Sequence, residues 1–280
     1  MAINPINATN LANYIPTILS KDVQMYIEKA LVFGGVVDRS YESEAKAGGS
    51  TMDVAIFSEL SATAVNTAAD MSLYDTLQNK ATISFNRKYD TGVAVDDINK
   101  LQTNPKYYDK AKTAIGYPLA KQIDADVAGL INSFSQSVGT EGSALSEDTI
   151  LAAYEYLNAA DAPATDRVWV FDPESITDLM KIDMFVRADY VGDTVWKTGF
   201  VGRQILGSPV YISSNLEALN TNYHGAGYFH KEALALVVQM PTQIETARIP
   251  LRHADAIIAL SVWGMAVLRD TFGCWIKTRS

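Results

Sequence analysis

The side chains that most often carry out chemistry are few in this sequence of 280 residues, and their spacing does not bring them together. The three histidines, His224, His230 and His253, share no spacing that would place two of them on one helical face as metal ligands. No G-x-S-x-G turn is present to expose a nucleophilic serine. The residues therefore predict no metal site, no cofactor and no enzyme. A Ser-His-Asp triad is assembled by the fold, so a small α/β hydrolase stays open as an alternative.

The single cysteine, Cys274, excludes an internal disulfide framework and is typical of a protein from a reducing compartment. Its neighbours include the aromatic residues Phe272 and Trp275. Because apolar surroundings make a thiolate costly, this position predicts a buried and unreactive thiol.

Two close pairs of carboxylates are the remaining candidates for acid–base chemistry. Asp96 and Asp97 follow a predicted strand, whereas Asp124 and Asp126 flank the apolar face of a predicted helix. Aspartates in such places commonly cap an element or face solvent. We expect all four to be surface or capping residues.

Three glycines within nine positions, Gly199, Gly202 and Gly207, invite comparison with phosphate-binding loops. A dinucleotide-binding loop opens a helix, because the helix N-terminus binds the pyrophosphate. Here Pro209 and the β-branched and aromatic residues after it predict a strand instead. No Gly-Lys-Ser/Thr triplet occurs, which excludes a P-loop. The glycines are therefore predicted to form turns.

The net charge of −9, from 32 acidic and 23 basic residues, disfavours strong direct binding of nucleic acid. Such binding needs a basic surface, because counterion release provides most of the non-specific affinity. The longest apolar run, residues 256–268, is too short for a membrane span, which takes about 20 residues. The first residues lack the basic segment of a secretory signal. We expect no association with a membrane.

The first part of the chain predicts an extended arm, a short helix over residues 21–32 that ends at Gly34 and Gly35, and a long hairpin. Apolar and polar residues alternate over residues 50–57 and 80–89, as in strands with one buried face. The segment between these strands shows no strong period and predicts a wide tip. Because an isolated hairpin is marginally stable in water, we expect this one to lie on another subunit.

A long helix is predicted to begin at Asn104 and Pro105, with the asparagine as N-cap and the proline at the first helical position. One apolar stripe continues to Phe134, and Pro118 within it predicts a kink. Residues 143–280 alternate helices with strands and predict an α/β domain with a mixed sheet. Two helices of this domain are predicted to follow the capping residues Ser146 and Asp172.

This order of elements resembles the major capsid proteins of tailed bacteriophages, which have the Hong Kong 97-type fold. Three segments carry the resemblance. The first, ADAPATDRVWVFDPESITDLMKIDMFVRADY, is similar to the family's helix, buried strand and proline-started helix. The second, GFVGRQILGSPVYISSNL, is similar to its glycine turn into a strand. The third, YFHKEALALVVQMPTQIETARIPLRHADAIIALSVWGMAVLRD, is similar to its closing segment.

The resemblance implies an α+β fold in four parts. These are an N-terminal arm (residues 1–41), an E-loop hairpin (42–90), a peripheral domain with a long spine helix (91–142), and an axial α/β domain with the closing strands (143–280). Some relatives crosslink an E-loop lysine to a neighbouring subunit. No catalytic partner can be matched to Lys46, Lys80 or Lys88, so that chemistry is not carried over.

The resemblance also implies a structural protein that self-assembles, as pentamers and hexamers, into an icosahedral shell enclosing double-stranded DNA. Such a protein is made in the cytoplasm of the host bacterium and ends in the virion capsid. Scaffold, cement or decoration, and portal proteins are implied partners, and the packaged DNA is held without sequence-specific binding. An encapsulin-like nanocompartment shell, which shares the fold, is the nearest alternative.

In such a shell, the apolar face and the tip of the hairpin are the predicted contacts with neighbouring subunits. The candidate residues are Met52, Val54, Ile56, Leu73, Tyr74, Ile83 and Phe85. In this interpretation a neighbour covers the apolar face, so the hairpin becomes ordered only on assembly.

Overall fold

The structure is a computed structural model that describes residues 32–46, 48–57, 62, 64, 78–96, 105–182, 204–219, 225–250 and 253–279. Several predictions concern residues outside this set. They are the arm over residues 1–20, nearly all of the helix over residues 21–32, the hairpin tip, Asp97, Gly199, Gly202 and His224.

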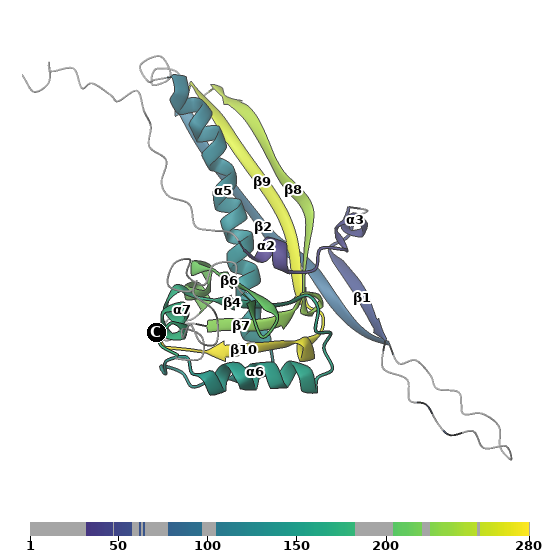
Figure 1. Cartoon of the computed structure of the whole chain (residues 1–280). Helices are drawn as coiled ribbons and strands as arrows, with labels where there is room; N and C mark the ends of the chain where they lie inside the picture. The colour runs from purple at the N-terminus through teal and green to yellow at the C-terminus, as the bar shows by residue number, and fades with distance from the viewer. Residues whose placement is uncertain are drawn as a thin grey trace, which may run out of the picture.

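The described residues form two β-sheets and one long helix that reaches both of them (Figure 1). An elongated sheet of four strands has the order β1-β2-β9-β8, and a second sheet of six strands has the order β3-β10-β7-β4-β6-β5. The strands are β1 (Thr51–Phe57), β2 (Gln78–Asp96), β3 (Ser137–Val138), β4 (Arg167–Phe171), β5 (Gln204–Ile205), β6 (Ser208–Ile212), β7 (Gly225–His230), β8 (Leu234–Ile249), β9 (Ala254–Val267) and β10 (Gly273–Lys277). The α-helices are α2 (Phe33–Val36), α3 (Glu42–Ala45), α5 (Pro105–Leu130), α6 (Glu147–Ala159) and α7 (Pro173–Leu179). Short 3-10 turns are η1 (Ile131–Ser133), η2 (Ser214–Leu219), η3 (Lys231–Ala233) and η5 (Asp270–Phe272).

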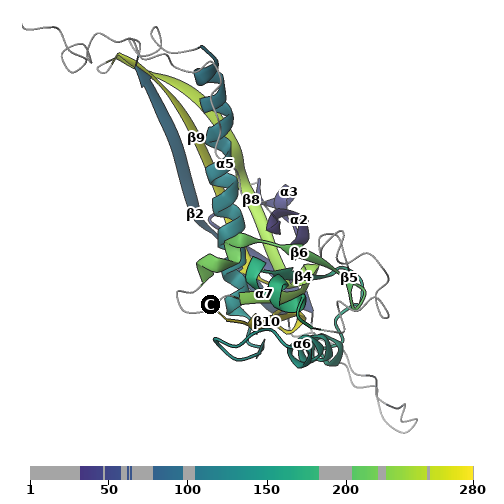
Figure 2. The same ribbon diagram turned by 60° about the vertical axis from the view of Figure 1, so that its left-hand side comes forward.

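The helix α5 lies along one face of the elongated sheet, as both ribbon views show (Figures 1 and 2). Ile257 and Ala259 of the inner strand β9 are buried against Ile115 and Leu119 of this helix. Because successive side chains of a strand point to opposite faces, the residues between them face away from the helix. One apolar stripe of α5 therefore holds one face of the sheet.

The six-stranded sheet is covered on both faces. Trp169 and Phe171 of β4 lie in an apolar cluster with residues of α6 and α7, whereas Val168 and Val170 lie in a second cluster with the end of α5 and α2. The pairs β4–β6 and β3–β10 are parallel, and the other pairs are antiparallel. The mixed sheet predicted for this part of the chain is therefore present.

Local sequence signals place the helix starts correctly. The helix α5 begins at Pro105 and contains Pro118, and the kink expected there stays a prediction. The side chain of Ser146 accepts a backbone N–H group at the start of α6, and that of Asp172 accepts two at the start of α7. These side chains satisfy N–H groups that have no partner within the helix.

The strand pairing links the predicted parts of the chain, and the division into four parts stays a prediction. The strands β8 and β9 fall within residues 143–280, yet they leave the six-stranded sheet and pair with each other and with β2 in the elongated sheet. The strand β2 continues to Asp96, past the predicted hairpin end at residue 90. Early and late parts of the chain therefore build one sheet. Such long-range pairing leaves no trace in local periodicity.

The glycine predictions had different outcomes. Gly207, with a φ of 80°, lies in the turn between β5 and β6, as predicted. In contrast, Gly34 and Gly35 lie inside the short helix α2 and do not end a helix. Phe33 and Val36 of this helix are buried in the cluster around α5. Tertiary packing of these two side chains outweighs the low helix propensity of glycine.

Candidate subunit-contact site

Three of the predicted contact residues are buried by their own chain. Val54, Ile83 and Phe85 are 9%, 0% and 6% exposed, and they pack with Ala235 and Val237 of β8. This corrects the expectation that a neighbouring subunit covers them. Alternation in a strand shows that one face is buried, but it does not show which chain buries it.

The other predicted contact residues divide into two groups. Met52 and Ile56 are half-buried; Met52 packs against the same cluster, and Ile56 lines a pocket of about 560 Å³ between β1 and η3. Leu73 and Tyr74 lie outside the described residues. A role of these four in subunit contacts stays a prediction.

The opposite face of the hairpin is polar and exposed. Asp53 accepts a hydrogen bond from the hydroxyl of Thr82 at 2.6 Å and one from Lys80 Nζ at 2.9 Å. Both hydrogen bonds lower the pKa of Asp53 below its usual value, and the one from Thr82 has the larger effect. This face is therefore a solvated surface held by cross-strand pairs.

Large apolar side chains are exposed at regular strand positions of the elongated sheet. They are Val93 (38% exposed), Ile244 (50%), Ile258 (41%) and Leu260 (40%). Ile258 and Leu260 alternate along β9 with buried residues and so point away from α5. By register, Val93 and Ile244 lie on the helix-facing side, on the strands that flank β9. Exposed apolar side chains that lie close together on a surface mark candidate interaction sites, and Ile258 and Leu260 form such a pair on one face of β9.

Sequence reasoning missed these exposed residues, although a signal was available. The run of residues 256–268 is almost continuously apolar, with no alternation of apolar and polar residues. Such a run is typical of a strand that is covered on both faces. The helix α5 covers only one face of β9. The apolar run therefore indicates that another protein surface buries the opposite face, which carries Ile258 and Leu260.

The carboxylates were expected to be surface or capping residues, and Asp124 is buried while it binds the start of a helix. Asp124 is 2% exposed; it accepts two backbone N–H groups at the start of α2 and the side-chain amide of Asn215. Asp126 is partly buried and accepts the indole N–H of Trp263. Asp96 ends β2. The partners of Asp124 lie more than ninety positions away, so no local pattern could reveal them.

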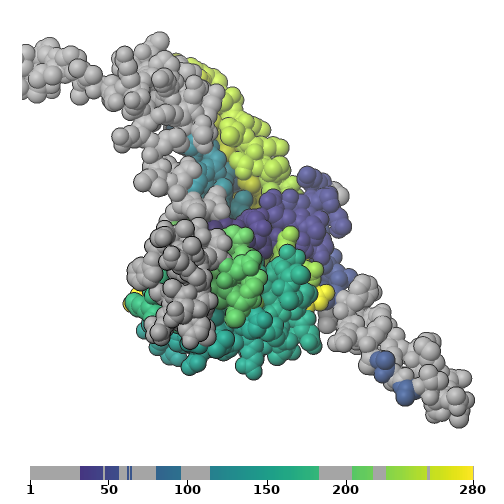
Figure 3. Space-filling view, viewed as in Figure 1, coloured from purple at the N-terminus to yellow at the C-terminus, as the bar shows by residue number. Residues whose placement is uncertain are grey.

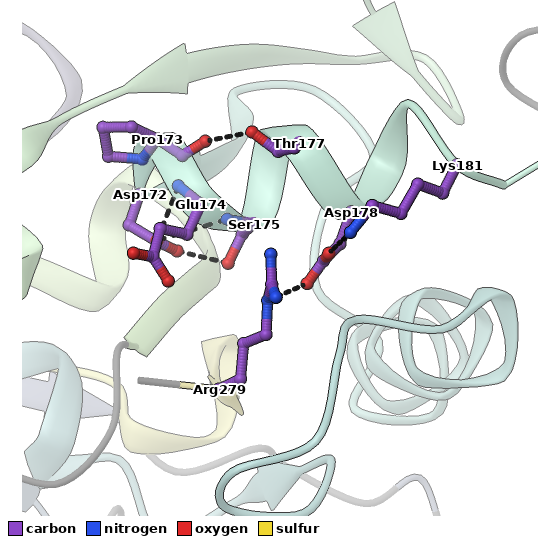
Figure 4. Close-up of polar contacts among 8 residues, drawn as sticks. All are labelled: Asp172, Pro173, Glu174, Ser175, Thr177, Asp178, Lys181 and Arg279. Carbon is purple, nitrogen blue, oxygen red and sulfur yellow. Dashed lines mark hydrogen bonds and ion pairs between the residues drawn. The ribbon is translucent and has the colours of Figure 1, made fainter.

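Another buried carboxylate joins α7 to the end of the chain (Figure 4). The side chain of Asp178 is 1% exposed and forms ion pairs with Lys181 Nζ at 2.8 Å and with Arg279 Nε at 2.9 Å. Burial raises the pKa of Asp178, but the hydrogen bond from Lys181 and the charge of Arg279 together lower it further, so the net pKa lies below its usual value. The pair with Arg279 holds the last described residues against α7.

Cys274 and His230 are the remaining candidate reactive side chains that are buried in the described part of the chain. Cys274 is buried as predicted, and burial raises its pKa to about 12. His230 is 4% exposed, burial lowers its pKa, and its Nδ1 accepts the backbone N–H of Glu232. Among the described residues, no group of three His, Cys, Asp or Glu side chains could hold a metal ion. None of the helices in that set is long and apolar enough to cross a membrane.

Comparisons with solved structures match nearly the whole chain, although no protein-family model and no curated protein matches it. A chain of Mycobacterium phage Che8 is 26% identical, with 94% of this chain and 97% of that chain covered and a TM-score of 0.77. The capsid structure of the cyanophage P-SCSP1u is 16% identical, with 97% and 95% covered and a TM-score of 0.73. The mature capsid of bacteriophage PhiM1 is 11% identical, with 94% and 91% covered and a TM-score of 0.70.

These matches extend over both sheets and the helix between them, and they confirm the resemblance carried by the three sequence segments. They also confirm the predicted α+β class and give no support to an α/β hydrolase. The two-sheet architecture, with α5 along the elongated sheet, is shared with these solved structures. This chain has the Hong Kong 97-type fold of the capsid proteins of tailed bacteriophages.

Proposed function

We propose that this chain is the major capsid protein of a tailed bacteriophage, and that its copies assemble into a closed icosahedral shell around double-stranded DNA. One observation carries the proposal: at least 94% of the chain matches solved structures that include two phage capsids, with TM-scores of 0.70 to 0.77. The predicted encapsulin-like compartment shares the fold but has no separate observation in its favour.

The four predicted parts are proposed here with bounds that follow the strand pairing. The N-terminal arm keeps residues 1–41, and the E-loop consists of β1, the first part of β2 and the segment between them. The peripheral part is α5 with β8, β9 and the rest of β2, which form one layer with the helix. The axial part is the six-stranded sheet with α6 and α7.

Contacts between subunits are proposed at the exposed apolar residues of the elongated sheet, above all Ile258 and Leu260. Complete burial of such a side chain contributes about 1.5–3 kcal/mol, and these two are already about half-buried, so each contact is modest. A closed shell repeats every contact many times, and repetition makes the assembly stable.

The charge of the chain fits a DNA container. A net charge of −9 limits adhesion of packaged DNA, because like charges repel. Scaffold, cement or decoration, and portal proteins are the proposed further partners. The proposed location is the virion capsid, after synthesis in the cytoplasm of the host bacterium.

The proposal is tested by expressing the chain alone, isolating large particles and identifying their contents. We expect closed shells that are empty or hold nucleic acid. Shells that enclose one enriched protein would favour the nanocompartment alternative. A chain that stays monomeric at all accessible concentrations, with native secondary structure, would contradict both assignments.

A further inference from the structure

The helix α5 connects two bodies, the elongated sheet and the six-stranded sheet. Its middle part packs on the elongated sheet through Ile115 and Leu119, and its C-terminal part packs on the six-stranded sheet through Val127. The short segment with α2 and α3, purple in Figure 3, lies where these two bodies meet. Apolar packing is non-directional, so by itself it leaves the angle between the two bodies weakly defined.

On one side of α5, Asp124 binds η2, which belongs to the six-stranded unit, and the start of α2, which lies where the two bodies meet. Its Oδ1 accepts the backbone N–H groups of Val32 at 2.9 Å and of Phe33 at 2.7 Å, and its Oδ2 accepts the side-chain amide of Asn215 at 2.6 Å. The residue is 2% exposed. Water therefore cannot replace a lost partner, and the carboxylate requires α2 and η2 at hydrogen-bond distance.

On the other side, Asp126 binds the elongated sheet. Its Oδ2 accepts the indole N–H of Trp263 at 3.1 Å, and Arg87 of β2 lies 3.9 Å from the same atom. Trp263 is fully buried and stacks on Tyr89 with ring centroids 5.0 Å apart. Residues two apart on a helix do not share a face, so Asp124 and Asp126 bind in different directions.

We propose that Asp124 and Asp126 form a polar joint that holds the elongated sheet at one angle to the six-stranded sheet, and so gives the assembled shell one curvature. The inference rests on the proposed function, because curvature has meaning only in a shell. Hydrogen bonds depend on distance and direction, so a change of angle breaks them where apolar contacts would slide. The same joint fixes the backbone of Val32 and Phe33 at the start of α2.

The test compares particle size among variants of the full chain. Asp124→Ala removes the acceptor of three donors, and Trp263→Phe removes the indole N–H but keeps an aromatic ring beside Tyr89. We expect both variants to give folded subunits whose particles shift from one diameter to a mixture of diameters and open sheets in electron micrographs. Particles of the single wild-type diameter from both variants would overturn the proposal.

Two control variants separate the joint from general damage. Trp169→Phe also shrinks a fully buried tryptophan and removes an indole hydrogen bond, but that bond goes to Ile205 within the six-stranded unit. Asp124→Asn keeps an oxygen for the two N–H groups, and the amide of Asn215 can turn to accept the new donor. Both are expected to keep the wild-type diameter. Mixed diameters from Trp169→Phe would overturn the proposal, because cavity formation alone would then explain the effect.

If the variants fail to fold, a measurement on the wild-type subunit still tests the joint. Hydrogen exchange of the Val32 and Phe33 amides is expected to be slow, because both donate to a buried carboxylate. Fast exchange of these two amides would overturn the proposed joint, whatever particle diameters the variants give. A wild-type chain that forms no particles, but shows slow exchange at these amides, would refute the proposed function while leaving the joint in place.

Discussion

At the scale of single residues, buried polar groups in this chain serve as attachments between elements. Asp124 and Arg167 are 2% and 4% exposed, and each is satisfied by partners from other segments. Arg167 donates to the side chain of Asn158 and to two backbone carbonyls before β4. Because a buried polar group without a partner is costly, such residues specify how elements meet.

Asp178→Asn is expected to lower the free energy of unfolding of the unassembled subunit by about 2 kcal/mol at neutral pH, since it removes charge-assisted contacts to Lys181 and Arg279. The pKa of Asp178 is lower in the folded state, so its stabilisation is complete above the unfolded pKa and is lost as the pH falls through the folded pKa. Urea denaturation at neutral and acidic pH measures this. If the free energies of unfolding of wild type and Asp178→Asn differed by the same amount at neutral and at acidic pH, the prediction would be contradicted. Lys181→Gln, at a side chain 62% exposed, should cost less.

Cys274 is expected to be inert in the folded subunit. With its pKa raised to about 12 by burial, almost no thiolate is present at neutral pH, and the sulfur is inaccessible. A colorimetric thiol reagent should react with the chain only after denaturation in urea. Rapid labelling of native subunits, at the rate of the denatured control, would show that β10 opens readily.

At the scale of elements, local signals in the sequence predict the starts of helices and the positions of strands well. They predict poorly which elements pack together in the fold. Pro105, Ser146 and Asp172 place three helices, because capping depends on residues within one turn. The cover of Phe85 could not be predicted, since β8 lies about 150 positions away in the chain. The same holds for Asp124, whose position beside an apolar stripe is equally typical of a surface residue.

Phe85→Asp is expected to prevent folding of the subunit. The side chain is 6% exposed within its own chain, and loss of a buried phenylalanine costs about 3–5 kcal/mol before the buried charge is counted. Asn86→Asp, at the adjacent exposed position, is the matched control and should fold normally. Soluble yield and circular dichroism measure both. A folded Phe85→Asp subunit that fails only in assembly would restore a neighbouring subunit as the cover of this face.

Ile258→Asp is expected to spare folding and to block assembly. Ile258 is 41% exposed on the face away from α5, so a charge there is solvated in the free subunit and buried in a contact. Ile257→Asp is the paired variant, because Ile257 is fully buried beneath α5 and its replacement should abolish soluble protein. Circular dichroism and sedimentation velocity distinguish these outcomes. Normal particles from Ile258→Asp would remove this surface from the proposed contacts.

At the scale of the whole molecule, the shape follows from one long sheet that draws strands from both ends of the chain. The strands β1 and β2 come from the first hundred residues, and β8 and β9 from the last fifty (Figure 1). The six-stranded sheet is built between them and is closed by β10. An elongated body attached to a second, covered sheet exposes much surface for its size, which suits a subunit that is completed by its neighbours.

The central claim is that copies of this chain assemble into a closed icosahedral shell, and cryo-electron microscopy of the purified wild-type chain tests it most directly. We expect closed particles far larger than the 30.5 kDa monomer, in which each subunit keeps the order β1-β2-β9-β8 and the face with Ile258 and Leu260 is covered by a neighbour. A folded chain that forms no closed particle, or a shell in which that face of β9 stays exposed to solvent, would contradict it.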